Sequence, residues 1–102
     1  MKHLVGTHSE LTQSGVLLKQ VEKKMVALFL VEGEVVAIED LCPHRAGPLS
    51  EGHRRGNTIV CPWHQSEFDL KTCQLLKGPS TRPLKRFVTE VEADRIYVVI
   101  PD

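Results

Sequence analysis

The 102-residue chain has no long hydrophobic segment. None of its apolar runs reaches the 18 or more residues that a membrane-spanning helix needs, so we expect no membrane span. The N-terminal stretch MKHLVGTHSEL lacks the apolar core of a secretory signal peptide, and Arg54-Arg55 lies mid-chain instead of in a twin-arginine leader. These absences predict a cytoplasmic protein that does not bind a membrane.

A net charge is also lacking, because 13 Lys and Arg balance 13 Asp and Glu. Aromatic residues are few and form no stripe with basic ones, which argues against nucleic acid as a partner. The charges are nevertheless uneven: they sum to −2 over residues 1–40, +5 over residues 41–86 and −3 over residues 87–102. The basic middle segment indicates a negatively charged partner or substrate, or else cations that only solvate loops.

Sustained helical periodicity is absent as well, so we expect an all-β fold. Ser9-Glu10-Leu11 is the one candidate for the start of a helical turn. Short apolar and β-branched runs separated by charged turn residues predict strands connected by hairpins. The expected strands are Val16–Val21, Met25–Val31, Val35–Ile38, Phe87–Val91 and Ile96–Ile100, with Met25–Val31 central because it is apolar on both faces.

The chain is short enough to form one domain, residues 1–102, with a modest core. Its composition changes between Ile38 and Leu84, where most of the prolines and all three cysteines lie. We interpret residues 40–83, approximately, as a small β subdomain inserted into an antiparallel β framework. Its expected strands are Thr58–Cys61, Glu67–Leu70 and Gln74–Leu76.

This middle stretch contains two Cys–His couples, Cys42-Pro43-His44 and Cys61-Pro62-Trp63-His64. Thiolates and imidazoles together suit zinc or an iron–sulfur cluster. Structural zinc usually takes neighbouring cysteines followed by neighbouring histidines, whereas here each couple holds one of each. A binuclear cluster fits this pattern better, because each couple can give its Cys to one iron and its His to the other. A zinc ion on the same four residues stays as an alternative.

The two segments CPHRAGPLSEG (42–52) and CPWHQSEFDL (61–70) resemble those of the Rieske family of 2Fe–2S proteins. The resemblance spans nearly the whole chain and is densest from residue 37 to residue 83. It implies the Rieske fold, an antiparallel β-sandwich base with a small inserted cluster-binding β subdomain. Further residues that match common Rieske positions are Gly47, Pro48, Leu49, Gly52, Ser66, Phe68, Asp69 and the Gly78-Pro79 step.

The resemblance also implies one 2Fe–2S cluster with Cys42 and Cys61 on one iron and His44 and His64 on the other. This arrangement raises the reduction potential above that of an all-cysteine cluster. Cys73 is then left without a disulfide partner, which fits a reducing cytoplasm. It follows Lys71-Thr72 in a tight turn where many relatives have glycine, so we expect a turn thiol with positive φ. The other histidines, His3, His8 and His53, match no motif position and are expected at the surface.

High-potential Rieske proteins of cytochrome bc-type complexes carry a disulfide between the two loops and Ser and Tyr hydroxyls near the cluster. This chain has Gly47 and Trp63 at the disulfide positions, keeps the serine as Ser66 and has Phe68 in place of the tyrosine. Fewer hydrogen-bond donors predict a potential toward the low end of the Rieske range. Trp63 is expected to pack over the cluster, and the prolines at 79 and 83 to stiffen a third loop.

The resemblance implies a soluble Rieske-type ferredoxin that passes single electrons from a flavin-dependent reductase to a terminal oxygenase. We expect a monomer that is not an enzyme by itself. Rieske oxygenases need a second, mononuclear iron, and only His3, His8 and His53 remain to ligate it. Arg45, directly after the first His, is a candidate partner contact or a solvated arginine. The alternatives are a small subunit of a larger oxidoreductase such as a nitrite reductase, or a regulatory module.

Overall fold

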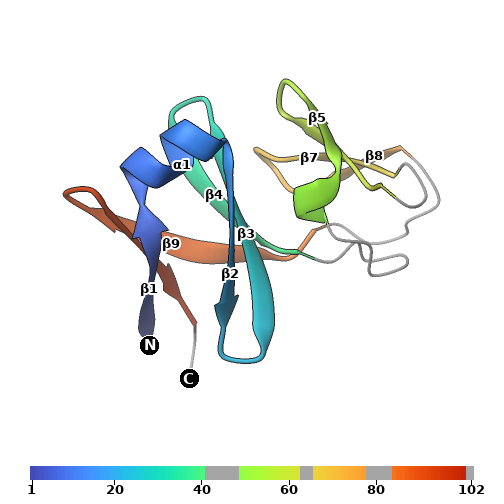
Figure 1. Ribbon diagram of the computed structural model, residues 1–102. Coiled ribbons are helices and arrows are strands. Elements are labelled where there is room, and N and C mark those ends of the chain that lie inside the picture. Colours follow the sequence, from blue (N-terminus) through green and yellow to red (C-terminus); the bar gives the residue numbers. More distant parts are fainter. Residues whose placement is uncertain (41–48, 63–65, 78–83, 101–102) are drawn as a thin grey trace.

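The computed structural model describes residues 1–40, 49–62, 66–77 and 84–100. Within these ranges the chain forms two antiparallel sheets, one α-helix and one 3₁₀ helix (Figure 1). No helix in the described ranges is long and apolar enough to cross a membrane. The elements are β1 (Lys2–Thr7), α1 (His8–Ser14), β2 (Val16–Val21), β3 (Lys24–Val31), β4 (Glu34–Glu39), η1 (Leu49–Glu51), β5 (His53–Arg55), β6 (Thr58–Val60), β7 (Glu67–Asp69), β8 (Leu75–Lys77), β9 (Arg86–Glu92) and β10 (Arg95–Val99).

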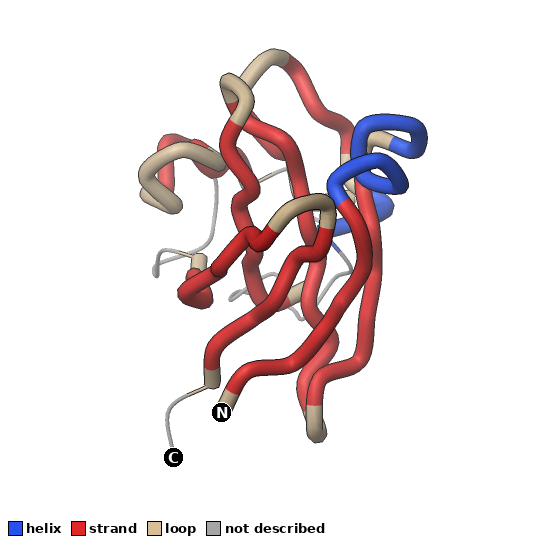
Figure 2. Tube along the Cα trace, turned by 90° about the vertical axis from the view of Figure 1, so that its left-hand side faces the viewer, coloured by secondary structure: helices blue, strands red, loops and turns tan. Residues whose placement is uncertain are grey.

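The larger sheet forms the base of the molecule, in the order β1-β10-β9-β4-β3-β2. Strands β4 and β9 pair through only two residue pairs, Ala37 with Phe87 and Ile38 with Arg86. The two halves of the sheet can therefore bend around a common core, and Figure 2 shows their strands surrounding it. The buried residues of this base core come from both halves: Val5, Leu11, Val21, Val26, Leu28, Val35, Ala37, Phe87, Ile96 and Val98. The predicted β-sandwich base is thereby confirmed.

Helix α1 joins the two edge strands of the base and is longer than the single turn expected from the sequence. Thr7 and Glu10 form a capping box: the Thr7 hydroxyl accepts from the Glu10 amide (3.1 Å), and the Glu10 carboxylate accepts from the Thr7 amide (3.0 Å). Gly15 ends the helix with φ 81°. Leu11, fully buried in the base core, gives the helix its tertiary support.

The predicted hairpin strands are confirmed, with boundaries that differ by at most one residue. The turns Glu22-Lys23, Glu32-Gly33 and Ala93-Asp94 each contain a positive φ, which suits two-residue hairpin connections. Strands β1 and β5 were not predicted. Strand β5 (sequence HRR) has no apolar residue, so its only signal is the pairing with β6.

The smaller sheet, in the order β5-β6-β7-β8, lies within the predicted insertion. One face of it packs against β3 and β4 of the base through a second buried core. That core contains Ala27, Phe29, Val31, Val36 and Ile38 from the base together with Leu49, Ile59, Cys61, Phe68, Leu70, Cys73 and Leu84. The second core orients the small sheet on the base.

Polar contacts at the same interface add to this packing. The Arg54 guanidinium donates to the carbonyl oxygens of Leu30 and Gly56. The exposed Glu32 carboxylate lies 3.0 Å from the Lys71 ammonium and accepts from the Asn57 side chain (3.1 Å). The hydrogen bond with Lys71 lowers the pKa of Glu32 and raises that of Lys71. An exposed pair of this kind contributes little stability, so it serves orientation more than stability.

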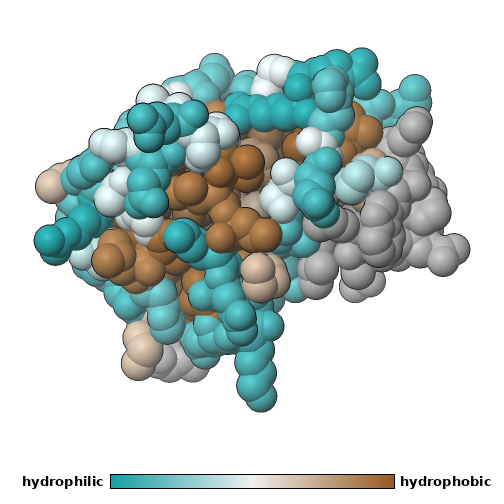
Figure 3. All heavy atoms as spheres, in the orientation of Figure 1, coloured by the Kyte–Doolittle hydropathy of each residue, from teal (hydrophilic) through white to brown (hydrophobic). Residues whose placement is uncertain are grey.

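Apolar side chains also gather on the surface of the base, framed by hydrophilic residues, in the space-filling view (Figure 3). Leu4 and Leu18, on the edge strands β1 and β2, are exposed.

Candidate metal centre

The structure describes one of the four predicted ligands, Cys61. Described residues lie on either side of the two Cys–His segments. Within the described ranges, no three or more His, Cys, Asp or Glu side chains group as a metal site. The predicted residues that lie outside the described ranges are Cys42, His44, Arg45, Gly47, Pro48, Trp63, His64, Gly78, Pro79 and Pro83.

Cys61 directly follows β6, and its side chain is fully buried. Its thiol forms no disulfide. Its amide donates to the carbonyl oxygen of Ser66 (2.8 Å), just beyond the pairing of Val60 with Glu67. The segment that carries the second Cys–His couple therefore leaves β6 and returns to β7 at adjacent points. A buried, unpaired thiol at such a chain reversal suits a thiolate ligand for iron or zinc.

The segment that carries the first Cys–His couple is closed in a comparable way by Asp40 and Ser50. Asp40 follows β4 and is only 3% exposed. Its carboxylate accepts hydrogen bonds from the amide and from the hydroxyl (2.8 Å) of Ser50 in η1. Residues 40 and 50, which flank this couple, are thus in direct contact.

Gly52 brings the chain after η1 against the strand that leads into Cys61. A Cβ atom added at Gly52 would lie 2.2 Å from the carbonyl oxygen of Val60 and 3.1 Å from that of Leu49. Only glycine permits this approach without a shift of the backbone. The two segments with the Cys–His couples are therefore joined at their bases through Gly52 and Val60.

Phe68 and Ser66, which were predicted to affect the potential, are both fully buried. Phe68 belongs to the same buried core as Cys61, pairing with Ile59 and Leu75 on the neighbouring strands. Phe68 therefore packs in this core. Its lack of a hydroxyl near the cluster stays a prediction about the potential.

Cys73 has the positive φ that was predicted for a turn thiol, 64°. Its amide donates to the backbone carbonyl oxygen of Asp69 (2.6 Å). Its own carbonyl oxygen accepts from the amide of Leu84 (2.9 Å), just before β9. The Asp69 carboxylate accepts from the amides of Lys71 and Thr72 within the same turn. Burial raises the pKa of the Cys73 thiol, so it is protonated and serves packing.

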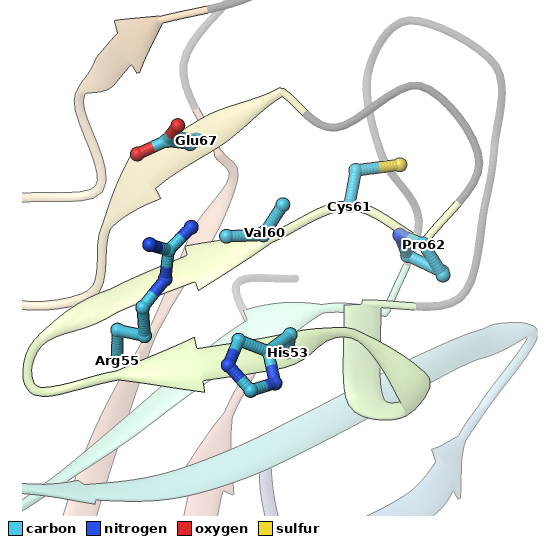
Figure 4. A pocket seen from close by; sticks show the side chains of 6 residues that line it. All are labelled: His53, Arg55, Val60, Cys61, Pro62 and Glu67. Carbon is cyan, nitrogen blue, oxygen red and sulfur yellow. The ribbon is translucent and has the colours of Figure 1, made fainter.

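A surface pocket of about 320 Å³ opens beside Cys61 (Figure 4). His53, Val60 and Glu67 lie in one row across β5, β6 and β7, and Arg55 lies on the same face of the sheet. His53 was expected to be an ordinary surface residue. It is exposed, and the pairing of β5 with β6 brings it to the pocket that Cys61 also lines.

Comparisons with known proteins identify the family to which the chain is similar. The family model described as Rieske [2Fe-2S] domain matches residues 1–88. The chain is 38% identical to the ferredoxin component of a naphthalene 1,2-dioxygenase system from Pseudomonas aeruginosa, over 87% of this chain and 86% of the relative.

Solved structures of other proteins also superpose on this chain. The carbazole 1,9a-dioxygenase ferredoxin from Nocardioides aromaticivorans IC177 superposes with a TM-score of 0.87 at 25% identity, covering 96% of each chain. A chain in a complex of reduced oxygenase and oxidized ferredoxin in carbazole 1,9a-dioxygenase gives 0.84 at 31% identity, over 94% of this chain and 99% of that one.

Proposed function

Because the chain belongs to the Rieske [2Fe–2S] domain family, we propose that it passes single electrons from a flavin-dependent reductase to a terminal oxygenase. It carries one Rieske 2Fe–2S cluster and is an electron-transfer component of an oxygenase system. When bound, the cluster supplies a centre that takes up and releases one electron. The similarity to a ferredoxin component over most of both chains is the observation that carries the proposal.

The proposed ligands are Cys42 and Cys61 on one iron and His44 and His64 on the other. Two described features support this assignment: Cys61 is a buried thiol outside any disulfide, and the bases of both Cys–His segments are joined. We further propose that the protein is a cytoplasmic monomer without catalysis of its own. Its relatives are named as the ferredoxin component or subunit of dioxygenase systems, which supports a role in electron transfer.

Electron transfer between purified components tests the proposed function. The holoprotein is mixed with a purified flavin-dependent reductase and a purified terminal oxygenase of a ferredoxin-dependent dioxygenase system, and product is followed during NADH oxidation. We expect product formation that depends on the holoprotein and is lost with Cys61→Ala. Reduced protein that the oxygenase does not reoxidise would contradict the proposal.

Arg55 is expected to assist partner docking through its positive charge. Its side chain is exposed beside the pocket at Cys61, whereas the neighbouring Arg54 is held by the base. Arg54→Glu would therefore disturb the interface between the two sheets. The two arginines are adjacent in sequence, but only Arg55 is available to a docking partner. We expect Arg55→Glu to slow reoxidation by the oxygenase about threefold or more at low salt, because charges near an interface act on association rates.

Stopped-flow rates at several salt concentrations check this prediction. Both the wild-type rate and the difference between wild type and Arg55→Glu should decrease as salt rises, since screening acts over about 8 Å at physiological strength. Arg95→Glu is the control, because Arg95 is exposed at the start of β10 in the large sheet and does not line the pocket at Cys61. A salt-independent rate that Arg55→Glu leaves unchanged would place docking elsewhere.

Phe68→Tyr is expected to raise the reduction potential. Phe68 lies on β7, two residues after Ser66, whose carbonyl oxygen accepts from the Cys61 amide, so we expect a hydroxyl on this ring to lie near a ligand sulfur. A hydrogen bond that favours the reduced form by about 1.4 kcal/mol raises a one-electron potential by about 60 mV. Protein-film voltammetry measures the shift.

Phe29→Tyr is the matched control, since Phe29 lies in the same core but on β3 of the base. It should leave the potential unchanged. For the wild type, a potential in the upper half of the roughly −150 to +300 mV Rieske range would contradict the low-potential assignment.

A further inference from the structure

Two buried polar residues, Asp40 and Ser66, are found within the described ranges, and each lies at the base of a Cys–His segment. Burying a carboxylate costs free energy unless its oxygens accept hydrogen bonds. Ser50 supplies such bonds to both oxygens of Asp40, and no Lys, Arg or His of the described ranges forms an ion pair with it. Within the described ranges, the hydrogen bonds from Ser50 therefore offset the free-energy cost of burying the Asp40 carboxylate.

The Asp40 side of this contact is fixed to the base. The Asp40 amide donates to the carbonyl oxygen of Met25 (2.9 Å) on β3. The preceding amide, of Glu39, donates to the carbonyl oxygen of Lys85 (2.9 Å) just before β9. Asp40 thus starts the first Cys–His segment from a rigid position between strands of the large sheet.

The Ser50 side of the contact is fixed to the small sheet. Ser50 belongs to η1, which the hydrogen bond from the Gly52 amide to the Leu49 carbonyl oxygen (3.0 Å) closes. Gly52 then lies directly against the carbonyl oxygen of Val60, the residue before Cys61. A continuous chain of contacts therefore runs from the base, through Asp40 and Ser50, to the strand that ends at Cys61.

We propose that Asp40 is a positioning residue for the cluster: its hydrogen bonds to Ser50 hold together the two described ends of the first Cys–His segment and connect them, through Gly52, to the strand that leads into Cys61. The inference rests on the proposed ligand set. Two segments that ligate one group must converge with little freedom, and the partners that orient ligands commonly change metal affinity 10- to 100-fold when removed.

Asp40→Asn tests this role with almost no change in size. The Asn oxygen can still accept from the Ser50 amide, but its NH₂ group only donates, so the Ser50 hydroxyl must turn from donor to acceptor and two charge-assisted hydrogen bonds become weaker neutral ones. From the isolated holoprotein with a chelator present, we expect the cluster to be lost several-fold faster than from wild type, measured by visible absorption. We also expect shifted g-values in the EPR spectrum of the reduced protein.

Ser50→Ala and Ser50→Thr form a second pair of variants. They test the Asp40–Ser50 contact even if Asp40→Asn does not fold. Alanine removes the hydroxyl donor but keeps the backbone amide, so one buried carboxylate oxygen of Asp40 loses its partner and the cluster should be lost faster than from wild type. Threonine restores a hydroxyl and should return the rate and the g-values toward wild type.

Leu11→Ala controls for a loss of stability without a change at the Cys–His segments, because Leu11 is buried in the base core under α1. We expect a lower melting temperature and unchanged g-values. The proposal is overturned where Leu11→Ala shifts the g-values as far as Asp40→Asn, or where Asp40→Asn and Ser50→Ala both keep the wild-type spectrum and cluster lifetime. All these readouts come from the isolated holoprotein, so a failure to reduce the oxygenase would contradict the proposed function and leave them unaffected.

Discussion

Cys61→Ala is expected to abolish the Rieske cluster, whereas Cys73→Ser is expected to retain it. Both thiols are buried and outside any disulfide. They differ in position, since Cys61 is at the base of a Cys–His segment and Cys73 is in a turn that its own backbone closes onto Asp69 and Leu84. Removing one of four proposed ligands leaves an iron without its thiolate, which the surrounding apolar side chains cannot replace. Visible absorption and iron content distinguish the variants.

The comparison of these two cysteines is a test of the ligand assignment and not only of stability. Serine is close in size to cysteine, so Cys73→Ser changes the buried core only modestly. Cluster loss in Cys73→Ser with a retained fold, measured by far-UV circular dichroism, would show that the proposed ligand set, which excludes Cys73, is wrong.

Gly52→Ala should be the most disruptive of the glycine substitutions. Its Cβ would approach two backbone oxygens, one of them at 2.2 Å, and backbone atoms cannot move aside as a flexible side chain can. Overpacking of this severity costs about 3 kcal/mol of the free energy of unfolding. Because Gly52 also joins η1 to β6, we expect a reduced iron content in addition to a lower melting temperature.

Gly33→Ala is the matched control for this substitution. Gly33 has φ 85° in a hairpin turn, and a Cβ there would meet nothing within 4 Å. The change should cost about 1 kcal/mol of conformational strain and leave the iron content at its wild-type value. Equal melting temperatures for the two variants would contradict the close approach of Gly52 to Val60.

Local sequence patterns were sufficient for the hairpins of the base. The apolar run of β3 and the charged turns beside it predict a central strand between two neighbours, which the structure confirms. Strand β5 could not be predicted, because its three polar residues become a strand only through pairing with β6. The Thr7–Glu10 capping box was present in the sequence as T-x-x-E, and it accounts for a helix longer than expected.

For the candidate site, the spacing of Cys and His predicts the ligand set but not how its segments are held. Arg54 and Arg55 are adjacent in sequence, yet they face opposite sides of β5, and only the register of the sheet decides which one contacts the base. The contact of Asp40 with Ser50 spans ten residues and leaves no repeating pattern. The role of Gly52 likewise depends on a backbone oxygen eight positions away.

The number of irons and acid-labile sulfides per chain tests the proposed centre most directly. Two complementary Cys–His couples in a Rieske family chain predict two irons and two sulfides in anaerobically purified protein. One zinc ion per chain and no sulfide would contradict the cluster and every electron-transfer proposal that depends on it.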